Sequence, residues 1–152
     1  QAGARVIGFD ILFAEPSTPA EDQAFAQALK NTKNVVLVSA LSVMNDPLFR
    51  HTVRVDPLPA FRNIAITGHP LVNVDADGLA RRTRLLALDM PSFALQVFRR
   101  FMGNPAGAIG MPEQKRFSQQ ALLQNVLINY QGPARTIKTV SYYSNPLQVV
   151  EF

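Results

Sequence analysis

The chemical groups that stand out in this sequence are carboxylates next to apolar segments. Asp10 interrupts the apolar run 5–13, and Glu15 follows it. A carboxylate at a strand end can be a nucleophile or a magnesium ligand, as in phosphatases with two Asp two residues apart. The partner position here is Leu12. A carboxylate with little access to water must be paired, so we expect Asp10 to accept hydrogen bonds from loop amides at a sheet edge.

A second acidic group lies in the segment 73–78, Asn-Val-Asp-Ala-Asp-Gly. Its spacing matches the first half of a calcium loop, but the twelfth position is Arg84 where a bidentate Glu is required. Asp-Gly tolerates the positive φ of a tight turn, which favours a hairpin with arms 71–74 and 79–88. We therefore prefer a hairpin turn to a calcium site.

The remaining candidates carry little catalytic chemistry. His51 and His69 have no neighbour at ligand spacing, and there is no Cys, nucleophile elbow or phosphate-binding glycine loop. Arg81, Arg82 and Arg84 could bind an anion, although alternate Arg on a strand are more often solvated. We expect no catalytic residue, no metal and no cofactor.

The first 40 residues predict a helix between two buried strands. The apolar runs 5–13 and 34–40 suit strands buried on both faces of a parallel sheet. Residues 18–21 carry a capping box with Pro in the first helical turn, and Asn31 offers an end. A right-handed β-α-β unit follows, with Asp10 near the carboxyl edge of its sheet.

Less regular signals mark the rest of the chain. Four prolines in 44–70 predict irregular structure with one short helical turn. Pro91 opens a second helix that Gly103 ends, and 103–124 is expected to be a surface loop. Two more extended segments are expected at 126–130 and 136–143. The fold class is therefore α/β: a mixed sheet with a parallel β-α-β unit plus a hairpin, and helices packed on the sheet.

Composition favours one folded domain over residues 1–152. A chain of 152 residues is long enough to bury roughly 70% of the unfolded surface. Hydrophobic residues make up 47% and charged residues 17%, which excludes disorder. The net charge of +4 is dispersed along the chain, which argues against nucleic acid as a partner. The longest apolar stretch, 35–44, is about half of a membrane span.

These segments together resemble the type-two CHASE domain, an extracellular sensory domain associated with bacterial cyclases and histidine kinases. The resemblance rests on the order and spacing of 4–17 with Glu21-Asp22, 34–37, 72–78 with Arg81-Arg82, 91–95, 127–133 and 139–142. That family normally has an earlier strand, a Trp-Pro segment and a closing apolar strand, whereas this chain has no Trp. Either the chain is a fragment truncated at both ends, or it is an atypical member of the family. If the missing strands belong to the same sheet, we expect an unpaired apolar edge that promotes self-association or low stability.

The resemblance implies a periplasmic or extracellular domain of a membrane receptor, held by its own transmembrane helices and joined to a cytoplasmic output domain. It also implies importance for matching positions. These are Asp10, Asp22, Asn73, Asp77, Gly78, Arg81, Ser92, Asn129, Tyr130 and Gly132.

The leading hypothesis is a sensor that binds a small-molecule or protein signal near Asp10 and the Asp77/Arg81 hairpin, and is not an enzyme. The candidate ligand-binding residues are Asp10, Asp22, Asn73, Asp77, Arg81, Asn129 and Tyr130. One alternative is a structural or dimerisation module, which forms a homodimer and binds nothing small. Another is a metal-dependent hydrolase using Asp10 and Asp22.

Overall fold

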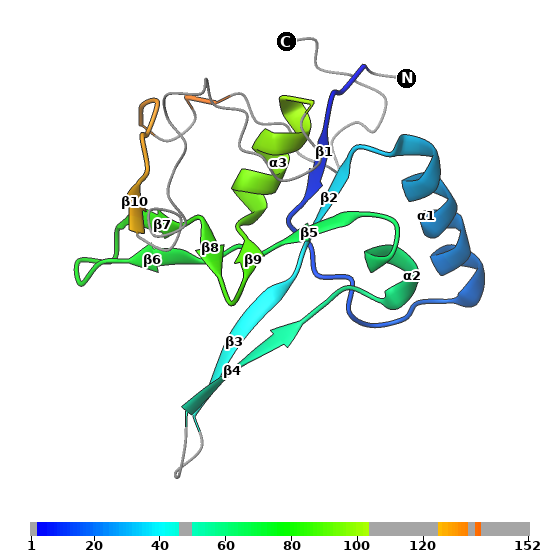
Figure 1. Cartoon of the computed structure of the whole chain (residues 1–152), viewed down its shortest axis with the longest axis horizontal. Coiled ribbons are helices and arrows are strands. Elements are labelled where there is room, and N and C mark those ends of the chain that lie inside the picture. Colours follow the sequence, from blue (N-terminus) through cyan, green and yellow to red (C-terminus); the bar gives the residue numbers. More distant parts are fainter. Residues whose placement is uncertain (1–2, 46–49, 104–124, 134–135, 138–152) are drawn as a thin grey trace.

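A three-stranded parallel sheet is at the centre of the chain. The computed structural model describes residues 3–45, 50–103, 125–133 and 136–137 (Figure 1). The sheet has the order β1-β2-β5, where β1 is Ile7–Phe9, β2 is Val35–Val38 and β5 is Ile66–Gly68. Ile7 pairs with Val35 and Val36 with Ile66, both in parallel register. The expected parallel β-α-β unit is confirmed.

The helix of that unit, α1 (Pro19–Thr32), begins at the predicted capping box. The backbone N–H of Glu21 donates to the Thr18 hydroxyl over 3.3 Å, and the Glu21 carboxylate accepts from the Thr18 N–H over 3.4 Å. These bonds satisfy donors that a helix start leaves free. The predicted end at Asn31 was wrong, because the helix runs to Thr32 and closes on Lys33 at a φ of 63°.

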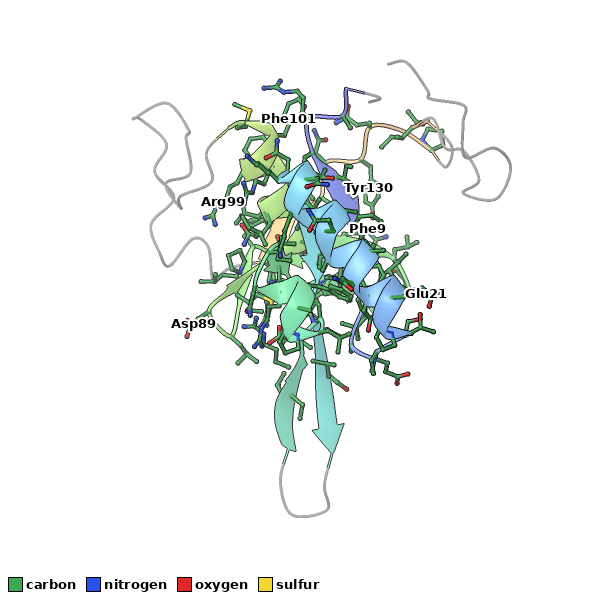
Figure 2. All side chains as sticks on the ribbon, turned by 90° about the vertical axis from the view of Figure 1, so that its right-hand side faces the viewer. Phe9, Glu21, Asp89, Arg99, Phe101 and Tyr130 are labelled. Atoms are coloured by element: carbon green, nitrogen blue, oxygen red, sulfur yellow. The ribbon has the colours of Figure 1, made fainter. Side chains whose placement is uncertain are left out.

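One face of the sheet is covered by α1 and by the short helix α2 (Pro59–Arg62). Figure 2 looks onto this layer, with both helices in front of the sheet. The buried core here consists of Leu29, Val35, Leu37 and Phe61, with Phe9, Phe13 and Phe25 packed against it. The aromatic rings meet at centroid distances of 4.8 to 6.1 Å, several edge to face. Such pairs stabilise by about 0.5–1.5 kcal/mol each beyond their buried area.

The helix α3 (Phe93–Phe101) packs on the opposite face of the sheet, against all three strands. Two glycines permit its close approach. A Cβ on Gly68 would lie 2.7 Å from the backbone N and Cα of Phe93, and one on Gly8 would lie 2.8 Å from the tip of the Phe93 ring. The fold therefore has three layers, with the sheet between α3 and the α1–α2 pair.

The segment 44–70 is more regular than predicted. β2 leads through Ser39 into β3 (Ala40–Asn45), which pairs antiparallel with β4 (Arg50–Val55) in a hairpin that projects from the body (Figure 1). The expectation of irregular structure was wrong there and at β5, whereas α2 confirms the short helical turn. The prolines of this segment lie outside the strands β3, β4 and β5, so they do not break the pairing.

The predicted hairpin at 71–88 is confirmed in part. β6 (Val72–Val74) and β7 (Ala80–Arg84) are antiparallel, and β10 (Asn125–Leu127) adds to the other edge of β7. The second arm ends at Arg84. A small hairpin of β8 (Leu86–Ala87) and β9 (Met90–Pro91) then reverses the chain.

Some of the remaining expectations are corrected by the structure, and others concern residues that it does not describe. β1 is not buried on both faces: it is a three-residue edge strand in which Ile7 is 36% exposed. Ser92, not Pro91, caps the second helix. The expected strand at 126–130 is shorter, and nearly all of the segments 103–124 and 136–143 lie outside the described residues.

Candidate functional site

Three polar side chains follow the three parallel strands directly. Asp10 comes after β1, Ser39 after β2 and His69 after β5. Since the carboxyl ends of parallel strands lie along one edge, these residues share the edge where open α/β sheets bind ligands.

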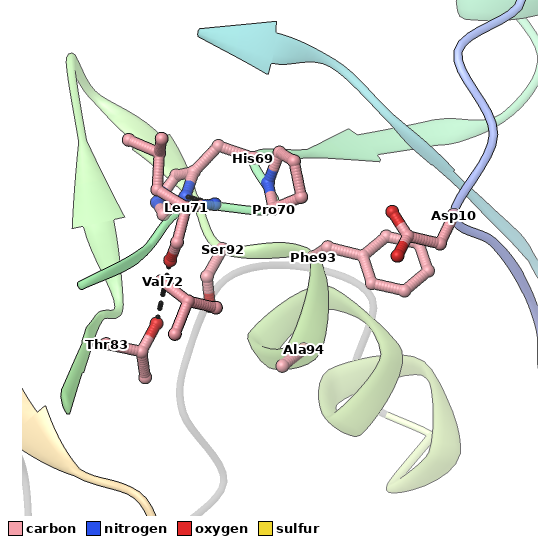
Figure 3. A pocket seen from close by; sticks show the side chains of 9 residues that line it. All are labelled: Asp10, His69, Pro70, Leu71, Val72, Thr83, Ser92, Phe93 and Ala94. Carbon is pink, nitrogen blue, oxygen red and sulfur yellow. Dashed lines mark hydrogen bonds between the residues drawn. The ribbon is translucent and has the colours of Figure 1, made fainter. Parts of the chain in front are cut away.

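A pocket of about 190 Å³ opens at this edge (Figure 3). It lies between the ends of β1 and β5, the start of α3 and the strands β6 and β7. Its lining residues are Asp10, His69, Pro70, Leu71, Val72, Thr83, Ser92, Phe93 and Ala94. The pocket thus has apolar walls with a few polar groups, as expected of a small-molecule site.

His69 is the most buried polar residue of the pocket, with 0% of its surface exposed. Its Nδ1 accepts a hydrogen bond from the Leu71 N–H over 3.3 Å, which assigns the proton of the neutral ring to Nε2. Nε2 has no hydrogen-bond partner within the described part of the chain. Burial lowers the pKa of His69 from its usual 6.5, so the ring is neutral at pH 7.

The backbone around His69 is fixed by α3 and β9. The His69 N–H donates to the Pro91 carbonyl over 3.1 Å, and its carbonyl accepts from the Phe93 N–H over 2.8 Å. Ser92, 3% exposed, accepts the Leu95 N–H on its hydroxyl over 3.2 Å. The hydroxyl proton of Ser92 therefore stays available as a donor.

Asp10 lies at the other end of the pocket. In Figure 3 Asp10 and the Phe93 ring lie on one side of the pocket, and His69 and Pro70 lie on the other. Asp10 is exposed, and none of the described residues donates a hydrogen bond to it. The expected pairing with loop amides was wrong for this part of the chain.

The acidic hairpin turn is a closed network rather than a cation site. Arg81 bonds Asp75 at 3.1 Å and Asp77 at 2.8 Å, and Arg82 bonds Asp75 at 3.4 Å. The hydrogen bond from Arg81 lowers the pKa of Asp77, and the Asp77 and Asp75 carboxylates raise the pKa of Arg81. With its carboxylates held by Arg81 and Arg82, this turn supports the hairpin interpretation over a calcium loop.

The other predicted site residues lie apart from the pocket. Asn73 donates to the Asn125 side chain over 2.9 Å, and the Tyr130 hydroxyl donates to the Ala80 carbonyl. Asn129 is exposed beyond β10. Asp22 accepts the Ser17 N–H over 3.3 Å in the first turn of α1. This helix lies on the opposite side of Figure 1 from the β6–β7 hairpin. Of the seven candidates, only Asp10 lines the pocket.

His69 is the functional candidate that sequence reasoning passed over. It has no His, Cys or acidic neighbour at ligand spacing, and it follows a strand of three residues in a proline-rich stretch. The sequence did contain a signal: a glycine lies shortly before each of the two polar residues. Gly68 comes directly before His69, and Gly8 lies two residues before Asp10. Glycines on two strands of one sheet indicate a close neighbour on one face of that sheet.

Among residues 3–45, 50–103, 125–133 and 136–137, no group of three or more His, Asp or Glu side chains is placed to hold a metal ion. Asp10 and Asp22, the pair of the hydrolase alternative, do not share the pocket.

The sequence of the chain matches the model of a known family. The CHASE2 domain family matches residues 1–150 of the chain. The chain belongs to this family. CHASE2 domains are extracellular sensory domains of signalling proteins, so this CHASE2 domain has a sensory role rather than a catalytic one. No curated protein and no solved structure matches the chain. Within the described residues, no helix of this CHASE2 domain has the length and apolar character of a membrane span.

Proposed function

We propose that this CHASE2 domain is the extracytoplasmic signal-binding module of a bacterial membrane-anchored receptor whose output is a cyclase, a histidine kinase or a Ser/Thr kinase. The signal binds in the pocket at the carboxyl edge of the parallel sheet. Family membership supports the sensory role, and the chemistry of the pocket supports the place of binding.

The observation that carries this proposal is the unpartnered Nε2–H of His69. A buried donor without an acceptor costs about 1–3 kcal/mol, so such groups are rare unless a ligand, an ion or water completes them. His69 lines a pocket whose far end holds the free carboxylate of Asp10. The two groups offer a ligand one donor and one acceptor.

The pocket is lined by three separate parts of the fold. Asp10 and His69 belong to the parallel sheet, Val72 and Thr83 to the β6–β7 hairpin, and Ala94 to α3. A ligand that contacts all three favours one spacing of these parts. Signalling requires such a difference in affinity between two states.

Thermal unfolding against a panel of small metabolites tests the proposal. A ligand at 100 times its Kd stabilises the folded state by about 2.7 kcal/mol, which raises Tm by several degrees. Ala94→Leu, which narrows the pocket at an exposed position, should abolish the shift, whereas Ala20→Leu on the exposed start of α1 should preserve it. A panel without effect, or a shift that survives Ala94→Leu, contradicts binding in this pocket.

A homodimer is a second candidate, favoured by the free edge of β1. β1 pairs with β2 on one side only within the described residues, and Ile7 and Ile11 beside it are 36% and 57% exposed. An unpaired apolar edge promotes strand pairing between copies. Sedimentation of the chain with Ile7→Lys tests this candidate, since a dimer should dissociate and a monomer should be unaffected.

A further inference from the structure

We propose that the ligand of the pocket is a small organic cation, whose ammonium group lies between the Asp10 carboxylate and the face of the Phe93 ring and whose far end accepts hydrogen bonds from His69 and Ser92. This inference deepens the proposed signal-binding function and rests on it.

The carboxylate of Asp10 sets the charge. Asp56, Asp75, Asp77 and Glu21 accept hydrogen bonds from neighbouring side chains or backbone groups, whereas Asp10 has no partner in the described part of the chain. The pocket beside it is walled by Pro70, Leu71, Val72 and Phe93. An ion pair is stronger beside apolar walls than in open water, because the local dielectric constant is lower. A cation is therefore attracted to this end, and an anion is repelled.

The Phe93 ring supplies the second contact for a cation. The tip of the ring lies against Gly8, two residues before Asp10, where a Cβ would be 2.8 Å from Cζ. An aromatic ring in the same pocket as a carboxylate favours an ammonium or alkylammonium group, since the negative face of the ring adds to the attraction. Figure 3 shows the carboxylate and the ring on the same side of the pocket.

The opposite end requires a neutral acceptor or a negatively polarised group. The Nε2–H of His69 and the hydroxyl proton of Ser92 are buried at this wall of the pocket, both without an acceptor in the described residues. His69 is neutral and supplies no full charge. A carbonyl, amide or hydroxyl oxygen satisfies these donors.

The volume limits the size of the molecule. A pocket of about 190 Å³ has room for on the order of six water volumes at about 30 Å³ each, so the part of the ligand that it holds is a short chain or a single small ring. Asp10 and His69 lie at opposite ends of the pocket, so the ammonium group and the acceptor are separated by an apolar body. The chemical class is a small ammonium compound with a remote carbonyl or hydroxyl group.

Three probes of one shape test the charge requirement. 5-Aminopentanamide carries an ammonium and an amide, pentanamide lacks the ammonium, and glutaramate carries a carboxylate in its place. Titration of the isotope-labelled intact chain by NMR gives a Kd for each probe and shows which residues respond. We expect the cation to bind at least tenfold more tightly than the neutral amide, with shifts at Asp10, His69 and Phe93, and the anion to bind most weakly.

Asp10→Asn and Asp89→Asn form a matched pair of variants. Both remove one negative charge, but Asp89 is exposed in the β8–β9 turn and is not part of the pocket (Figure 2). Asp10→Asn should weaken the cation about tenfold, the value of one charge-assisted hydrogen bond, and leave the neutral amide unchanged. Asp89→Asn should change neither Kd. Because Asp10 is exposed, its replacement leaves the fold intact.

The outcomes separate the two proposals. Preferential binding of the anion or of the neutral amide, with shifts at pocket residues, overturns the cation inference and leaves the sensory pocket standing. A second outcome leads to the same conclusion: none of the three probes binds at millimolar concentration, while a metabolite still raises Tm and Ala94→Leu abolishes that shift. Cation binding that is equal in Asp10→Asn and Asp89→Asn also overturns it.

Discussion

The Ser39 hydroxyl donates a hydrogen bond to Oδ1 of Asp56 over 2.7 Å and joins the end of the central strand to the end of the projecting hairpin. Ser39 is fully buried. Asp56 also accepts from Arg54 over 2.6 Å and from Arg62 over 3.0 Å. Partial burial alone would raise the pKa of Asp56, but the bonds from Ser39, Arg54 and Arg62 outweigh it and hold the pKa below 3.8.

Asp56→Ala should therefore lower the free energy of unfolding by about 2 kcal/mol, because it leaves the buried Ser39 hydroxyl without an acceptor. Chemical denaturation measures this loss. Asp75→Ala is the control: it breaks ion pairs with largely exposed Arg81 and Arg82 and should cost at most about 1 kcal/mol. If Ser39→Ala and Asp56→Ala were fully additive in the double variant, the two side chains would not be coupled.

The two glycines under α3 should respond differently to alanine. At Gly68 a Cβ meets backbone atoms of Phe93 at 2.7 Å, so the helix itself must shift, and we expect a loss of about 1–3 kcal/mol or more. At Gly8 the Cβ meets the tip of the Phe93 side chain, which can rotate. Gly8→Ala should thus cost less stability in thermal unfolding while it displaces the ring from the pocket. An equal cost at both positions would contradict the close packing of α3 at Gly68.

Stability should fall as the pH drops below about 6.5, because of His69. Burial lowers the pKa of the folded state, so the unfolded chain takes up a proton first and unfolding becomes easier with acidification. The stabilising effect is complete above pH 6.5 and decreases by at most about 1.4 kcal/mol per pH unit below it. Denaturation curves between pH 7.5 and 5 should show this slope in the wild type and a smaller slope in His69→Gln.

The lowered pKa values of Asp56, Asp77 and Glu21 act in a separate window, since their contributions are present above the ordinary values of 3.8 and 4.5 and are lost only in stronger acid. A slope between pH 7 and 5 that persists in His69→Gln would assign it to another group.

Thr18→Ala should destabilise α1 by about 1 kcal/mol. The Thr18 hydroxyl accepts the Glu21 N–H, and the variant removes this acceptor from the first turn. Thermal unfolding with Thr52→Ala as a comparison, a threonine of β4, separates the cap from a general effect of removing a hydroxyl. Thr18→Asp should keep the stability of the wild type, because Asp is an equally good cap.

Local signals in the sequence were sufficient for much of the fold. The capping box at Thr18, the Asp-Gly turn at Gly78 and the β-branched run of β2 each depend on neighbours within a few residues, and each is where it was predicted. The parallel pairing of β1 and β2 followed from the right-handed crossover through α1.

Long-range packing explains the errors. β1 was predicted to be buried from its composition, yet burial depends on whether another strand lies beside it, which its own residues do not specify. The pocket combines Asp10, Thr83 and Ser92 with His69 over four separate segments. Since β5 is three residues long, no periodicity marked the strand that positions His69 at the sheet edge.

The continuity of β2 and β3 has a mechanical consequence. One residue, Ser39, separates β2, the middle strand of the parallel sheet, from the β3–β4 hairpin that extends beyond the body (Figure 1). The same middle strand is hydrogen-bonded to β5, which His69 follows directly. A change in the angle of the hairpin is therefore transmitted through one residue to β2, and from β2 to the strand β5 that His69 follows. A contact made far from the ligand cavity can in this way change the shape of the cavity, and a bound molecule can change the angle of the hairpin.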